Sequence, residues 1–87
     1  MPPSKRLSSE VVEQRVRLEL LRLAQLRAAT GSTFCPSEVA RAVAREWRPL
    51  MPLVRKVARE LGLEATQRGN RVSILNAKGP IRLRAAL

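Results

Sequence analysis

The hydrophobic pattern of this chain changes its period once, at Gly62. Up to that residue, apolar side chains recur every three or four positions, which is the spacing of one face of an α-helix. After it, Leu63 and Ala65 alternate with polar residues, and so do Val72 and Ile74, which is typical of strands with one buried face. Helices followed by a short hairpin predict a small α+β domain that is mainly helical.

Three helices are expected before the change, over about residues 9–29, 36–47 and 50–61. Ser8 or Ser9 can cap the first, prolines stand in the first turns of the other two, and glycines follow the first and the third. The residues expected on their buried sides are Val12, Val16, Leu20, Leu23 and Ala24, then Val39, Ala40, Val43 and Trp47, then Val54, Val57, Ala58 and Leu61. We interpret Trp47 as a core residue rather than a stacking platform, because stacking surfaces normally use several aromatic rings.

The second half adds a hairpin and a tail. Gly69-Asn70 tolerates the positive φ angles of a tight turn, so it is expected to join the two strands of a wing. In the tail, Ile81 and Leu83 alternate with arginines, which favours a short extra strand. Three helices followed by a basic-tipped hairpin is the order of a winged helix-turn-helix.

The expected domain organisation is a flexible basic arm over residues 1–8 and a single domain over residues 9–87. The most apolar stretch, Leu18 to Leu26, is too short and too charged to span a bilayer, so we expect no membrane association. A lone cysteine, Cys35, fits the reducing cytoplasm and is expected to be a small buried side chain.

Missing residue types argue against catalysis. The chain has no His, no Asp and no Tyr, so it cannot build His-based triads or paired-aspartate metal sites. We therefore expect a protein that is not an enzyme and that needs neither a metal nor a cofactor.

The charge instead points to a polyanionic partner. Seventeen Lys and Arg against seven acids give a net charge of +10, and fourteen of the cations are Arg, whose planar guanidinium suits phosphate and guanine. Residues 48–87 carry nine cations and two acids, hence +7, whereas residues 1–47 carry eight and five, hence +3. We expect double-stranded DNA as the partner and a role as a small transcriptional regulator.

The predicted interface combines the third helix with the wing. Arg55 and Arg59 are expected to reach base edges, while Lys56, Arg68 and Arg71 are expected to contact the backbone. The full predicted set is Arg48, Arg55, Lys56, Arg59, Gln67, Arg68, Asn70 and Arg71. An ordinary solvated cationic face is the alternative interpretation of the third helix. Arg82 and Arg84 fit protection of a strand edge as well as they fit a contact.

Two other functions stay open. The same basic surface could bind structured RNA, and competition between duplex DNA and RNA would separate the two. A protein-interaction winged helix without any nucleic acid is the third reading, in which Leu18, Leu21 and Leu26 of the first helix form a homodimer or meet another partner.

Four segments, "CPSEVARAVA", "WRPLMPLVRKVARELG", "TQRGNRVS" and "GPIRLR", resemble those of domain-of-unknown-function family 3253, a group of small bacterial proteins. They lie between Cys35 and Arg84, so the first helix is outside them. The resemblance implies a fold similar to winged helices and no assigned activity. It marks as motif positions Ser37, Glu38, Trp47, Arg48, Met51, Pro52, Arg55, Gln67, Arg68, Gly69, Gly79, Pro80, Arg82 and Arg84, without stating their roles.

Overall fold

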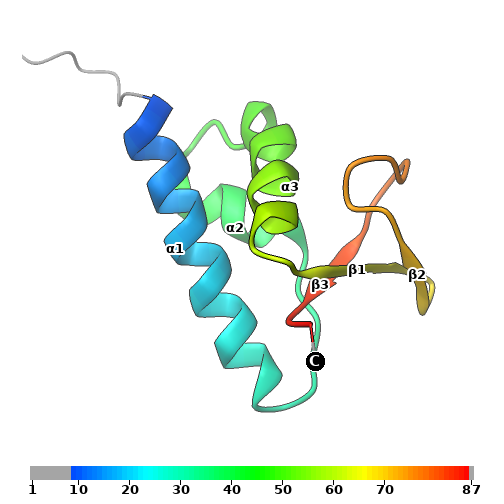
Figure 1. The fold of residues 1–87 in the computed structure, drawn as a ribbon. Helices are drawn as coiled ribbons and strands as arrows, with labels where there is room; N and C mark the ends of the chain where they lie inside the picture. The colour runs from blue at the N-terminus through cyan, green and yellow to red at the C-terminus, as the bar shows by residue number, and fades with distance from the viewer. Residues whose placement is uncertain (1–8, 87) are drawn as a thin grey trace, which may run out of the picture.

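The computed structural model describes residues 9–86, in which three α-helices form one side of the molecule and a three-stranded antiparallel sheet forms the other (Figure 1). The predicted arm over residues 1–8 lies outside the described residues. The element order is α1 (Ser9–Ala28), α2 (Pro36–Val43), a 3-10 turn η1 (Arg48–Leu50), α3 (Met51–Glu60), β1 (Glu64–Gln67), β2 (Asn70–Val72) and β3 (Arg82–Arg84). This confirms the predicted α+β class and its winged-helix-like order.

The core lies between the helices and the inner face of the sheet. It consists of Val16, Leu20, Leu23, Ala24, Phe34, Val39, Ala40, Val54, Val57, Ala58, Ala65, Ile74, Ile81 and Leu83. Most of the predicted helical positions are in this set, whereas Val12, Val43 and Leu61 are only half-buried. In the described part of the chain, no helix has both the length and the apolar character that a bilayer crossing needs.

The second helix ends four residues earlier than predicted, at Val43. Ala44 is extended, with φ of −148° and ψ of 147°, although its N–H still donates to the Ala40 carbonyl at 3.0 Å. Arg45 and Glu46 are exposed, so another helical turn would bury no apolar surface that could stabilise it. The prediction that this helix continues to Trp47 was therefore wrong. The helix ends where it no longer has apolar surface to bury, and not where the local sequence stops favouring a helix.

Trp47 packs at the edge of the core instead of inside it. Its ring is half-buried, and the guanidinium carbons of Arg41 and Arg48 lie 4.5 and 4.6 Å from the ring centroid. Because two cations already lie over the indole, the ring is occupied by contacts within the protein.

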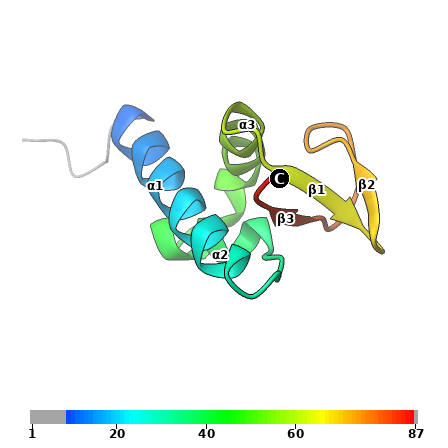
Figure 2. The same ribbon diagram turned by 60° about the horizontal axis from the view of Figure 1, so that its bottom comes forward.

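The sheet has the order β2-β1-β3, with β1 in the centre (Figure 2). Ala65 pairs with Val72 on one side and with Leu83 on the other, so these three side chains face the helices. The tail strand was correctly predicted. Phe34 bridges to Leu83 through two backbone hydrogen bonds of 2.9 and 2.7 Å, which attaches the segment before α2 to the sheet.

The hairpin turn lies one residue earlier than expected. Gln67 pairs with Asn70, so the two turn residues are Arg68 and Gly69, with φ of +51° and +82°, and Asn70 begins β2. Asn accepts positive φ more readily than Arg. The register nevertheless keeps Ala65 opposite Val72 on the buried face, since a slip of one residue would turn each side chain to the other face.

Candidate nucleic-acid interface

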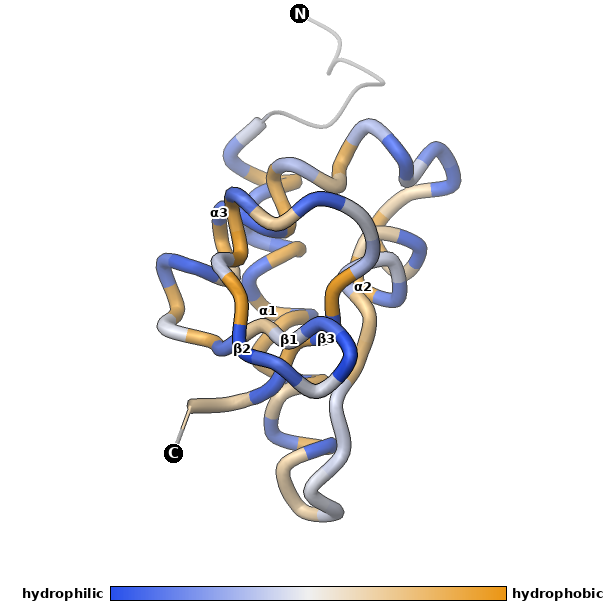
Figure 3. Tube along the Cα trace, turned by 90° about the vertical axis from the view of Figure 1, so that its right-hand side faces the viewer, coloured by the Kyte–Doolittle hydropathy of each residue, from blue (hydrophilic) through white to orange (hydrophobic). Residues whose placement is uncertain are grey.

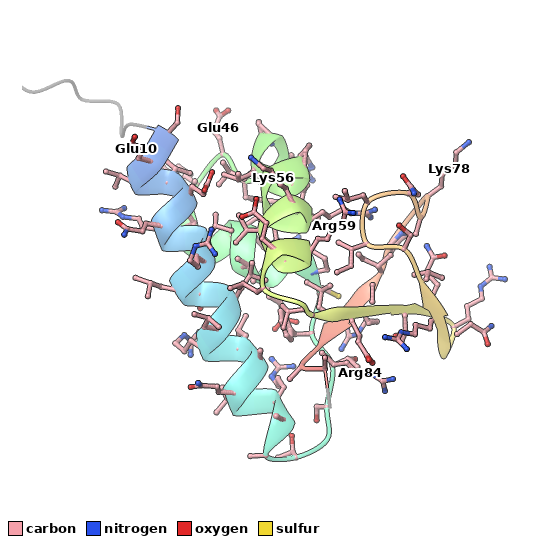
Figure 4. All side chains as sticks on the ribbon, viewed as in Figure 1. Glu10, Glu46, Lys56, Arg59, Lys78 and Arg84 are labelled. Atoms are coloured by element: carbon pink, nitrogen blue, oxygen red, sulfur yellow. The ribbon has the colours of Figure 1, made fainter. Side chains whose placement is uncertain are left out.

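The exposed side of α3 carries two cations from the predicted set. Lys56 and Arg59 are exposed, and the side chain of neither makes a hydrogen bond or an ion pair with any residue between 9 and 86 (Figure 4). Arg48 is exposed one turn before α3, where its guanidinium lies over Trp47. α3 begins at Met51 with Pro52 in its first turn, as predicted.

Arg55, by contrast, is turned inward. Its guanidinium donates to the carbonyls of Ile74 at 3.3 Å, Ala77 at 2.7 Å and Gly79 at 2.8 Å. The side chain is half-buried. A guanidinium that already donates to three carbonyls is a support for the chain between β2 and β3, which we call the 74–80 loop, and it is not free to contact a base.

Gln67 holds the same loop from the sheet. It belongs to the predicted interface set, but its side-chain amide donates to the carbonyls of Lys78 at 2.6 Å and Pro80 at 3.1 Å. Gln67 lies on the inner face of β1 with Ala65, which aims its side chain at the loop. The 74–80 loop is thus connected to α3 through Arg55 and to the hairpin through Gln67.

The loop in turn presents Lys78, which the sequence prediction missed. Lys78 is exposed and projects away from the molecule at the end of the loop (Figure 4). Its position directly before Gly79-Pro80 is a turn signal that could have indicated an exposed tip.

The hairpin turn supplies the remaining free groups. Arg68 and Asn70 are exposed, and within the described residues neither side chain has a hydrogen-bond or ion-pair partner. The hollow between the turn and the loop has a volume of about 580 Å³ and is lined by Gln67, Arg68, Asn70, Val72, Lys78 and Pro80. Seen from this side, the turn is strongly hydrophilic (Figure 3). The two cations at its rim make this hollow electropositive.

Arg71 belongs to the other face of the sheet. It pairs across the strands with Thr66, on the face opposite Gln67, and its guanidinium lies 3.0 Å from the Glu64 carboxylate. Glu64 also holds Arg84 at 3.1 Å. Arg84 lies on the opposite side of β1 from Lys78 (Figure 4). The structure therefore separates Arg71 from the cations of α3 and the loop.

Arg82, the first residue of β3, is also bound within the protein. Arg82 donates to the hydroxyl of Thr33 at 2.9 Å, to the Thr33 carbonyl at 3.0 Å and to the sulfur of Cys35 at 2.9 Å. Cys35, which was expected to be a small buried side chain, is only half-buried just before α2. Arg82 thus joins β3 to the start of α2 and is not free to bind a partner.

Comparison with known proteins agrees with the expected resemblance. A family model described as "Protein of unknown function (DUF3253)" matches residues 13–86. The match includes α3, the hairpin and the loop, and it begins inside α1, earlier than the motifs noted in the sequence. A search of the curated proteins found no match. Among the described residues, no group of three His, Cys, Asp or Glu side chains could hold a metal ion.

Proposed function

This chain belongs to the DUF3253 family of proteins of unknown function, and from its own surface we propose that it is a nucleic-acid-binding module that holds double-stranded DNA. In this proposal α3 enters the major groove, and the hairpin with the 74–80 loop lies along the adjacent backbone. The module acts by binding and not by catalysis, as a small transcriptional regulator would.

The observation that carries the proposal is the connection of α3 and the hairpin to one loop. Arg55 and Gln67 together donate five hydrogen bonds to carbonyls of residues 74–80. The free cations on α3 are thereby held in a fixed arrangement with those of the turn and the loop. A rigid spacing of this kind suits a polymer whose charges are themselves regularly spaced.

The charge distribution supports the same surface. The +7 net charge of residues 48–87 includes Lys56, Arg59, Arg68 and Lys78, none of which has a carboxylate partner in the described structure. Such cations attract phosphates and release condensed counterions on binding. Glu13 and Glu19 of α1 and Glu64 of β1 instead pair with arginines outside this surface.

Within the proposal, the side chains have different roles. Arg59 and Lys56 are the groups on α3 that reach the groove, and Arg68 and Lys78 contact phosphates. Arg55 and Gln67 act as positioning residues. Arg71 stays with Glu64, and Trp47 stays with its two arginines, which argues against binding of single strands by base stacking.

The proposal is tested by fluorescence anisotropy with a randomised duplex at two salt concentrations. The double variant Lys56→Ala/Arg59→Ala is expected to reduce the slope of log K against log salt by about 2, because each phosphate contact contributes about 1. Arg15→Ala is the matched control, since Arg15 is an exposed cation on α1 without an ion-pair partner between residues 9 and 86, and it should leave the slope unchanged.

A structured RNA serves as the competitor. Stronger retention of the RNA than of the duplex would reassign the surface to RNA. A folded protein that retains no duplex even at low salt would refute the proposal.

A further inference from the structure

Two arginines near the α2–α3 connection (residues 44–50) share one aromatic ring. The guanidinium carbon of Arg41, in the last turn of α2, lies 4.5 Å from the centroid of the Trp47 ring, and that of Arg48 lies 4.6 Å from it. The ring is half-buried and packs against the core, and the Trp47 carbonyl accepts a hydrogen bond of 2.9 Å from the N–H of Leu50. The indole is therefore a fixed support for both side chains, and we call Arg41, Trp47 and Arg48 the arginine–tryptophan cluster.

The two guanidiniums of the cluster have unused hydrogen-bond donors. A cation over an aromatic ring is attracted by the ring quadrupole, which leaves the N–H groups of a guanidinium available for an oxygen acceptor. Arg41 and Arg48 are exposed, and within residues 9–86 neither side chain makes a hydrogen bond or an ion pair. Arg55 and Arg82, by contrast, direct their donors to acceptors within the protein. The cluster therefore presents donors that lack acceptors in the described structure.

The positive charges of the cluster are close together and uncompensated. Because both guanidinium carbons lie near the centroid of one ring, their separation cannot exceed the sum of those two distances. Like charges this close repel each other, and a bound anion removes that repulsion. Glu46 is the only carboxylate among residues 44–50, and it is exposed and forms no ion pair with any described residue. The cluster is thus suited to an anion from outside the chain.

The spacing of the two donors suits a phosphate backbone. Charges on one strand of B-DNA repeat about every 3.4 Å along the helix axis, so neighbouring phosphates can each face one guanidinium. A guanidinium fork also matches two oxygens of a phosphate. Beside the ring lies an open hollow of about 420 Å³, which gives a backbone room to approach and is lined by Arg45, Glu46, Trp47, Arg48 and Pro49.

We propose that Arg41 and Arg48, held over Trp47, bind phosphate groups of a nucleic-acid backbone. Trp47 is a positioning residue, because it holds both guanidiniums in place and its own ring is covered by them. Arg41 is a new member of the candidate interface, which the sequence prediction did not include. The affinity of the cluster for phosphate is independent of the proposed function, whereas its place on a duplex rests on that function.

The cluster would extend the candidate interface to the other side of α3. The α2–α3 connection lies on one side of α3, and the 74–80 loop lies on the other (Figures 1 and 2). If α3 enters a major groove, its two sides face the two strands that border the groove. The hairpin and the loop would then contact one strand, and the cluster would contact the other.

The first test uses the fluorescence of Trp47, which is the only tryptophan in a chain without tyrosine. The full chain is titrated with pyrophosphate, and separately with potassium chloride at the same ionic strength. Pyrophosphate should change the emission and reach saturation, because guanidiniums that bind it shift relative to the ring, whereas chloride should not. A triglutamate peptide is the carboxylate probe and should bind more weakly than pyrophosphate.

Variants of the two arginines show whether they form the site. Arg41→Lys/Arg48→Lys keeps both charges but loses the planar forks, so the midpoint of the pyrophosphate titration should rise several-fold. Arg41→Ala/Arg48→Ala should abolish the saturable change. Lys56→Ala/Arg59→Ala is the matched control, because it removes two exposed cations from α3, and it should keep the wild-type midpoint. All these side chains are exposed, so circular dichroism should show unchanged helical content.

The second test places the site on a duplex. In anisotropy titrations at several salt concentrations, Arg41→Ala/Arg48→Ala is expected to reduce the slope of log K against log salt by about 2, since two phosphate contacts are lost. Arg15→Ala should leave the slope unchanged. The emission of Trp47 in the wild type should also change when the duplex is added.

Three results would overturn the proposal. They are a Trp47 emission that pyrophosphate does not change, a midpoint that the arginine variants leave unchanged, and a triglutamate peptide that binds as tightly as pyrophosphate. A pyrophosphate response with an unchanged duplex slope would overturn the backbone assignment and give the site to a free phosphate compound. A normal pyrophosphate response in a protein that retains no duplex would refute the proposed function and leave the phosphate site standing.

Discussion

Arg55 and Gln67 donate hydrogen bonds to alternating carbonyls of one loop, Arg55 to Ala77 and Gly79, and Gln67 to Lys78 and Pro80. One donor comes from α3 and the other from β1. The loop that presents Lys78 is therefore held by both elements of the candidate interface.

Removing the Arg55 guanidinium should destabilise the fold. Arg55→Ala leaves three carbonyls without their donor and is expected to lower the free energy of unfolding by about 2 kcal/mol, in the range for hydrogen bonds from a charged group. Urea denaturation measures the change. Arg59→Ala, one turn further along the same helix, should change it by less than about 0.5 kcal/mol, because Arg59 is exposed. Equal losses in the two variants would contradict the assigned support role.

Arg55 and Gln67 should be energetically coupled. Since both bind the same loop, the loss in Arg55→Ala/Gln67→Ala should differ from the sum of the single losses by at least about 0.5 kcal/mol. A double-mutant cycle by urea denaturation gives this number. Gln67 paired with Arg27→Ala is the control cycle, because Arg27 bonds to Thr33 and Glu38 and not to the loop. If the losses in the first cycle are additive, Arg55 and Gln67 are not coupled through the 74–80 loop.

Replacing the turn residue Arg68 should make the fold more stable and weaken duplex binding. Arg68 has a φ of +51°, a conformation that costs most side chains about 1 kcal/mol but that Asn adopts readily. Arg68→Asn should therefore raise the free energy of unfolding by up to about 1 kcal/mol while it weakens duplex binding by the loss of one cation. Thermal unfolding and anisotropy on the same sample test both halves. A variant that is no more stable would mean that the turn holds Arg68 without strain.

Arg71 should matter less for binding than Arg68, although the two arginines lie only three positions apart. Arg68→Ala is expected to reduce the salt slope of duplex binding by about 1, whereas Arg71→Ala should leave it unchanged because Glu64 holds Arg71 on the other face. Anisotropy titrations at several salt concentrations compare the two. An equal loss of slope would place the partner on both faces of the hairpin.

The ion pairs of Glu64 with its two arginines should stabilise the fold, and this contribution should depend on salt. Glu64→Gln removes the charge that pairs with Arg71 and Arg84 and is expected to cost about 1 kcal/mol, since exposed ion pairs contribute a few tenths to 1 kcal/mol each. The difference from the wild type should shrink in 1 M salt, where charges are screened. Urea denaturation at low and high salt measures it, and a cost that salt leaves unchanged would point to packing instead of charge.

The sequence allowed the fold to be predicted because period and turn residues act locally. The helical spacing up to Leu61, Gly62 after α3 and the alternation of Ile81 and Leu83 each determine a short segment, and the structure confirms those segments. The end of α2 was not predictable in this way, because it depends on whether Arg45 and Glu46 find anything to pack against.

The candidate site was harder to predict because the sequence does not distinguish a free arginine from a bound one. The carbonyls that receive Arg55 lie 19 to 24 residues away along the chain, and the carboxylate that holds Arg71 lies on another strand. The place of Arg68 in the turn was likewise decided by the pairing of Ala65 with Val72 and not by the preference of Asn for positive φ. Each of these contacts exists only after the sheet has formed.

The two edge strands of the sheet, β3 and β2, are protected from further strand pairing in different ways. Beyond β3, the backbone of Phe34 occupies hydrogen-bonding groups that a further strand would need. Beyond β2, the border is only three residues long and carries an arginine, which is a poor template for another strand. Neither edge of the sheet is therefore a good template for a strand from another chain.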